Sequence, residues 1–106
     1  MTIDDEEIAR LKRPERLRLS VLSGFVGEVT QNLGAVSASF DGTLIHLSAY
    51  FFNEPSEEDR EHIELVGTYV IADYPEPFTI ETHFLLLSQR PLKGIPWLFL
   101  RAEAER

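Results

Sequence analysis

The sequence contains no cysteine and only one methionine and one tryptophan among its 106 residues. Without cysteine the chain cannot form disulfides, thiolate-ligated metal centres or a thiolate nucleophile. No apolar run approaches the roughly 20 residues that a membrane-spanning helix needs, and the first residues are acidic, unlike a secretory signal. We therefore expect a cytoplasmic protein that makes no membrane contact.

Basic residues are also scarce. Ten lysines and arginines stand against 18 acidic residues, for a formal net charge of −8. Residues 28–89 hold eleven acids and a single base, Arg60, whereas residues 1–27 hold five of each. This excess repels a phosphate backbone, so direct nucleic-acid binding is disfavoured, and it favours capture of a basic partner. Solubility alone explains the acidity equally well.

The length corresponds to one domain, and 43% hydrophobic with 26% charged residues is ordinary globular composition. We expect a single domain over 1–106, with residues 1–7 as a flexible acidic tail.

The first half of the chain predicts helices followed by a hairpin. A short helix ends before Pro14, and apolar residues spaced by three and four then predict a helix over 14–31. Gly24 and Gly27 inside that helix indicate close packing against another element. From Ala35 the period changes to two, and Asp41-Gly42 predicts a type I′ turn before a strand over 43–52.

The second half predicts a helix and two more strands. Ser56 is placed to cap a helix that Pro75 stops, and the helix carries acids in its first turns. Strands are expected over 78–87 and 95–101, joined by a loop with Pro91, Gly94 and Pro96. The expected fold is α+β: a two-layer sandwich of an antiparallel four-stranded sheet with two helices on one face, in the order α-β-β-α-β-β.

Catalytic and metal-binding patterns are weak. His46, His62 and His83 do not fall at the short spacings of a metal site, and no cofactor-binding motif is present. Glu81 and His83 share one face of a strand, which is the minimum apparatus for proton transfer, but a half-exposed strand explains them better. The bases between Arg10 and Arg18 are expected to form local ion pairs or part of a self-association surface.

The most unusual feature is a carboxylate-rich surface on the helix after Ser56, bordered by aromatics. We predict that it binds a partner, because acids steer a cationic partner and aromatic rings anchor it. The predicted contact residues are Glu57, Glu58, Asp59, Glu61, Glu64, Asp73 and Glu76, and the bordering aromatics are Tyr50, Phe52, Tyr69, Tyr74 and Phe78.

Two segments, 16–33 (RLRLSVLSGFVGEVTQNL) and 49–75 (AYFFNEPSEEDREHIELVGTYVIADYP), resemble immunity proteins of contact-dependent growth inhibition systems. The resemblance covers about half of the chain and contains no catalytic motif. It implies a cytoplasmic inhibitor, not an enzyme, that binds and neutralises a cognate toxin domain, often a nuclease. A nuclease must present cations to hold phosphates, so a carboxylate-rich inhibitor suits it.

Two alternatives stay open at this point. One is a small hydrolase or toxin that uses His83 and Glu81, and the other is a homo-oligomeric adaptor, such as a homodimer.

Overall fold

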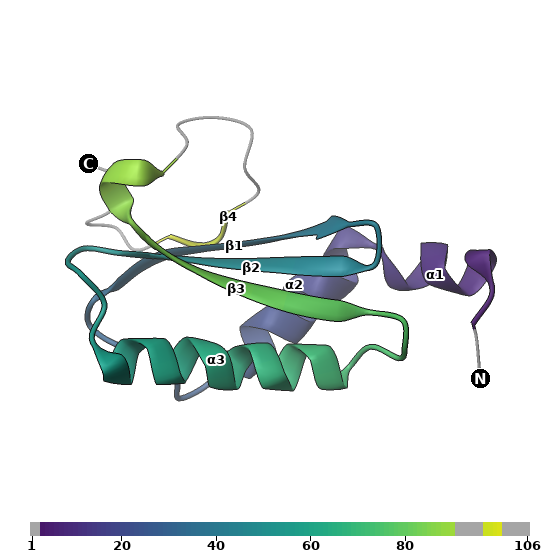
Figure 1. Ribbon diagram of the computed structural model, residues 1–106, viewed down its shortest axis with the longest axis horizontal. Coiled ribbons are helices and arrows are strands. Elements are labelled where there is room, and N and C mark those ends of the chain that lie inside the picture. Colours follow the sequence, from purple (N-terminus) through teal and green to yellow (C-terminus); the bar gives the residue numbers. More distant parts are fainter. Residues whose placement is uncertain (1–2, 91–96, 101–106) are drawn as a thin grey trace.

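The computed structural model describes residues 3–90 and 97–100 (Figure 1). This part of the chain contains three α-helices, a short 3₁₀ helix and four strands. Their bounds are α1 Asp5–Leu11, α2 Pro14–Gly24, β1 Leu33–Asp41, β2 Leu44–Phe51, α3 Glu57–Ala72, β3 Thr79–Leu86, η1 Leu87–Gln89 and β4 Trp97–Leu100. The predicted loop with Pro91, Gly94 and Pro96 lies outside the described residues, as do the ends of the predicted strand 95–101.

The four strands form one mixed sheet in the order β3-β2-β1-β4. β1 pairs antiparallel with β2 and β4, but β2 and β3 run parallel. The prediction of a fully antiparallel sheet is therefore wrong at one edge. The physical reason is α3: it connects β2 to β3, and a strand–helix–strand connection returns the chain in the same direction.

Helices α2 and α3 cover one face of the sheet, as predicted, while α1, a third helix, extends beyond the end of the sheet (Figure 1). The core lies between the two layers and contains residues that are at most 7% exposed. From the helices it takes Leu17, Val21, Ile63, Val66 and Val70; from the sheet it takes Val36, Ala38, Ile45, Leu47, Ala49 and Phe51. The inward face of β2 is thus the Ile45, Leu47, Ala49, Phe51 face.

Helix α2 ends at Gly24 and does not continue to residue 31 as predicted. Gly27 has φ +80°, a conformation that ends a helix and that side chains rarely adopt. Val26 and Val29, which extended the apolar spacing, are 81% and 43% exposed. The close packing expected at Gly24 is confirmed, because a Cβ there would lie 3.2 Å from Cγ1 of Val66. At Gly27 the same expectation is wrong, because a Cβ there would meet no atom within 4 Å.

The predicted hairpin between β1 and β2 is confirmed, but its turn differs. Asp41 pairs with Leu44, so the two turn residues are Gly42 and Thr43. Gly42 has φ +62°, and no other residue than glycine has positive φ in the described part. A glycine at the first central position is typical of a type II′ turn rather than of the predicted type I′ turn.

The N-terminal acids are partly structured. Asp5, Glu6 and Glu7 form the first turn of α1, and the side chain of Asp4 accepts a hydrogen bond from the Glu7 amide at 2.8 Å. Most of the segment expected as a tail therefore belongs to a capped helix. None of the described helices combines enough length with enough apolar character to cross a bilayer.

Candidate functional site

The outer face of α3 carries four of the predicted contact residues. Glu57, Glu58, Glu61 and Glu64 are all exposed, because the opposite side of the helix buries Ile63, Val66 and Val70 against the sheet. The helix begins at a capping box, in which the Ser56 hydroxyl accepts from the Asp59 amide at 3.1 Å. The four carboxylates thus stand on a rigid, well-capped element. We call Glu57, Glu58, Glu61, Glu64, Leu65 and Tyr69 the α3 face.

The last two members of the α3 face are apolar. Leu65 is 39% and Tyr69 is 48% exposed, although both are large. Tyr69 lies beside the end of α2, since a Cβ on Gly24 would be 3.6 Å from its Cβ. A surface that combines an exposed tyrosine and leucine with carboxylates has the composition of a protein-binding site.

Asp59 does not belong to this face, although the sequence placed it there. It is 7% exposed, and its Oδ2 accepts hydrogen bonds from the Ser56 amide at 2.9 Å and from Asn32 Nδ2 at 3.1 Å. Burial acts to raise the pKa of Asp59, but these hydrogen bonds, together with one from Thr30, outweigh it and lower the pKa below the usual 3.8. Asp59 therefore stabilises the start of α3 and its contact with the loop before β1.

The remaining predicted acids lie at the other end of α3. Asp73 is the C-cap of the helix and accepts a hydrogen bond from the Ser20 hydroxyl at 2.5 Å, while Glu76 is exposed in the following loop. Asp73 therefore joins α3 to α2. Of the predicted bordering aromatics, Phe52 and Tyr69 are exposed, but Tyr50, Tyr74 and Phe78 are at most 7% exposed. Tyr74 and Phe78 belong to the core, and Tyr50 packs against Trp97.

His62 connects α3 to the segment that follows α2. Its Nδ1 lies in close hydrogen-bond contact with Oε2 of Glu28, and its Nε2 lies 3.7 Å from Oε1 of Glu58. The hydrogen bond with Glu28 raises the pKa of His62 above 6.5; partial burial opposes the rise, and the charges of both carboxylates add to it. Residue spacing does not indicate this pair, because its members are 34 residues apart.

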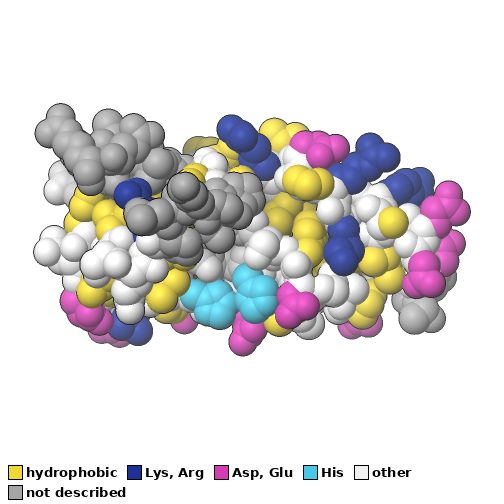
Figure 2. Space-filling view, turned by 90° about the horizontal axis from the view of Figure 1, so that it is seen from above, with side chains coloured by type: hydrophobic (Ala, Val, Ile, Leu, Met, Phe, Trp, Pro, Cys, Tyr) yellow, Lys and Arg dark blue, Asp and Glu magenta, His cyan; other side chains and the backbone are white. Residues whose placement is uncertain are grey.

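The basic residues of the N-terminal segment line a shallow groove of about 720 Å³ that includes Arg10, Arg13, Arg16 and Asp73. Figure 2 shows Lys and Arg side chains gathered toward the α1 end of the molecule. Arg16 donates to the Asp73 carbonyl oxygen at 3.4 Å and lies over the Tyr74 ring. Among the described residues, Arg10, Arg13 and Arg16 form no ion pair with a carboxylate within 4.0 Å. The local ion pairs expected for these arginines are therefore absent, and that prediction is wrong.

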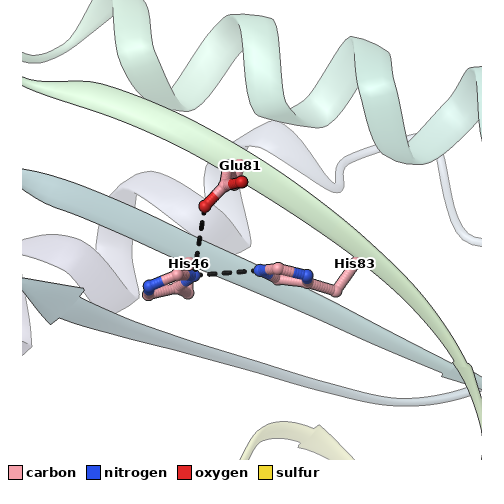
Figure 3. Close-up of side chains that lie close together, drawn as sticks. All are labelled: His46, Glu81 and His83. Carbon is pink, nitrogen blue, oxygen red and sulfur yellow. Dashed lines mark hydrogen bonds and ion pairs between the residues drawn. The ribbon is translucent and has the colours of Figure 1, made fainter.

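A second cluster lies on the face of the sheet away from α2 and α3. His46 from β2 and Glu81 from β3 are paired neighbours in the parallel ladder, and His83 follows two residues later on the same side (Figure 3). His46 Nδ1 lies 2.9 Å from His83 Nε2 and 3.9 Å from Glu81 Oε2. One donor atom from each residue lies within 4.8 Å of the other two, so these residues can surround a metal ion.

Sequence spacing missed this juxtaposition, because His46 and His83 are 37 residues apart and meet only through the parallel pairing. The prediction that Glu81 and His83 share a face is confirmed.

No curated protein matches the chain in sequence. A protein-family model, the MafI2 immunity protein, matches residues 14–103, which run from the start of α2 past β4 and include the whole α3 face. The resemblance is therefore confirmed at the level of an immunity protein, a family that implies an inhibitor of a toxin. The family belongs to the Maf toxin system, however, and the match does not identify a contact-dependent growth inhibition system. The chain belongs to the MafI2 immunity protein family.

Proposed function

We propose that this immunity protein neutralises its cognate toxin by binding a basic toxin domain through the α3 face and occluding it. The observation that carries the proposal is the exposure of four carboxylates beside Leu65 and Tyr69 on one capped helix. The proposal places the encounter in the cytoplasm, with the C-terminal toxin domain of a cognate delivery protein as the partner, as the resemblance implies.

Charge complementarity supports a basic partner. Arg60 is the only arginine or lysine within α3, and its guanidinium lies 3.7 Å from Glu54 and over the Phe84 ring, so it does not neutralise the outer carboxylates. Such a surface raises the association rate with a cationic domain. A nuclease domain fits, because it must hold phosphates with cationic side chains.

The exposed apolar residues supply the second part of the interface. Desolvating Tyr69 and Leu65 against a partner removes apolar area from water, and a tyrosine gives such contacts at low entropic cost. The carboxylates would then set the orientation and exclude nucleic acid from the covered toxin surface. Inhibition by this route needs binding and no turnover.

Charge reversal tests the proposal. In cells that express the toxin domain encoded beside the immunity gene, Glu57→Lys, Glu58→Lys and Glu61→Lys together should abolish protection and weaken binding of the purified partners more than tenfold. The matched control reverses Asp5, Glu6 and Glu15, which are exposed acids in the first turns of α1 and α2 and change the net charge equally. Full protection by a folded α3 variant would exclude this surface.

An enzymatic function would rest on His46, Glu81 and His83, whose side chains approach within hydrogen-bond or ion-pair distance. If the protein is an inhibitor, His83→Ala should leave protection against the toxin intact. If it is a hydrolase, the same change should abolish its hydrolytic activity.

The remaining alternative from the sequence analysis is that the protein forms a homodimer. Light scattering on the purified chain tests it, with a molar mass of about 12.1 kDa expected for a monomer.

A further inference from the structure

We propose that His46, Glu81 and His83 form a binding site for one divalent first-row transition metal ion such as Zn²⁺. Two imidazoles and a carboxylate are a ligand set that Zn²⁺ uses, with a water molecule at the fourth position. The inference does not depend on the proposed toxin contact, because its three residues come from β2 and β3 in the sheet layer, whereas the α3 face belongs to the helical layer (Figure 1).

Two of the three donor-atom separations lie close to those around a tetrahedral ion, and all three are within 4.8 Å. With metal–ligand bonds of about 2.0–2.2 Å, two ligand atoms of a tetrahedron lie about 3.3–3.6 Å apart. The observed separations from His46 Nδ1 are 2.9 Å to His83 Nε2 and 3.9 Å to Glu81 Oε2, which lie on either side of that value. Shifts of about half an ångström in these side chains would bring both to it.

The other nitrogen of His46 has a carboxylate nearby, at a distance longer than a hydrogen bond. If Nδ1 binds the ion, Nε2 must carry the proton, and Nε2 lies 3.9 Å from Oδ2 of Asp41. A carboxylate behind a ligating imidazole fixes its tautomer and increases its basicity. Asp41 is 81% exposed, so we expect its contribution to be smaller than that of the three ligands.

The strands hold the ligands before any ion arrives. β3 is the edge strand, and the register sets His46 opposite Glu81 and Ser48 opposite His83. The two imidazole rings are already stacked, with centroids 5.1 Å apart and planes inclined by 29°. The side chain of His46 is 29% exposed and that of Glu81 is 58% exposed, so the site is partly sheltered and still open to an ion and its water.

Titration of Zn²⁺ into the full chain, prepared without a histidine tag and freed of metal by a chelator, tests the site by calorimetry. We expect one ion per chain. His46→Ala and His83→Ala should each weaken binding at least tenfold, and Glu81→Gln should weaken it severalfold. His62→Ala is the matched control, because His62 is also half-buried and beside carboxylates but lies on α3, and it should leave the affinity unchanged.

Two further measurements separate the site from unspecific binding. Co²⁺ in place of Zn²⁺ should give the visible absorption of a tetrahedral ion, and it should be lost in His46→Ala. In the unmodified chain, the side-chain ¹⁵N resonances of His46 and His83, and not those of His62, should shift when Zn²⁺ is added. Absence of saturable binding, equal affinity in all variants, or a shift centred on His62 would each overturn the proposal.

Discussion

Removing the Asp59 carboxylate should destabilise the protein without damaging the α3 face. In Asp59→Ala the amide of Ser56 and the side chain of Asn32 lose an acceptor at 2.9 and 3.1 Å. Each hydrogen bond to a charged group contributes about 1.5–3 kcal/mol, but Ser56 is exposed and Asn32 is half-exposed, so both donors regain water in part. We therefore expect the free energy of unfolding to fall by about 2 kcal/mol.

Urea unfolding followed by far-ultraviolet circular dichroism measures this loss. Glu57→Ala is the matched control, because Glu57 lies in the same first turn but is exposed, and it should cost about 0.5 kcal/mol. If both variants lose the same stability, Asp59 does not have the structural role assigned to it.

The same variant has a defined pH dependence. The pKa of Asp59 is lower in the folded protein than its usual 3.8, so its stabilising effect is fully present above that value and is lost as the pH falls through the folded pKa. The difference in stability between the unmodified chain and Asp59→Ala should be constant from pH 5 to 7 and should shrink below about pH 4. A difference that does not change with pH would refute the account.

Three other predictions follow from single features. Gly42→Ala should lower the free energy of unfolding by about 1–2 kcal/mol in urea unfolding, because φ is +62° there. No atom lies within 4 Å of the added methyl group, so this cost comes from the backbone conformation and not from a clash. The pKa of His62 is raised by Glu28, so the pair stabilises the folded protein below pH 6.5, and this stabilisation is lost as the pH rises through the folded pKa. Glu28→Gln should therefore lower the melting temperature at pH 6, whereas at pH 9 the loss of the pair should not change it. The association rate with the toxin domain should fall steeply as salt increases, as measured by stopped-flow fluorescence, since the carboxylates of the α3 face are exposed.

The elements that the sequence predicted well are those specified locally. Ser56 caps α3 as expected, and the alternating residues of 43–52 form β2. Both features depend on residues a few positions apart, so spacing alone is enough to identify them. The length of α2 was overestimated because Val26 and Val29 continue the apolar spacing, whereas the chain turns at Gly27.

The features that the sequence did not predict depend on distant pairing. The parallel direction of β3 follows from the crossover of α3, for which the order strand, helix, strand was a visible but unused signal. That direction also sets His83 beside His46, so the cluster with Glu81 could not be found without the register. Asp59 lies four residues before Ile63 and seven before Val66, on the buried stripe of α3, so helical spacing was a visible but unused signal for its inward position. Its hydrogen bond with Asn32, 27 residues away, could not be found in this way.

The most direct measurement of the central claim is a backbone amide spectrum of the ¹⁵N-labelled protein, recorded as the unlabelled toxin domain is added. We predict that the largest shift changes fall on residues 57–69, around the exposed acids, Leu65 and Tyr69. Changes concentrated on the open sheet face around His46 and His83, or on the groove around Arg10 and Arg16, with α3 unaffected, would contradict it.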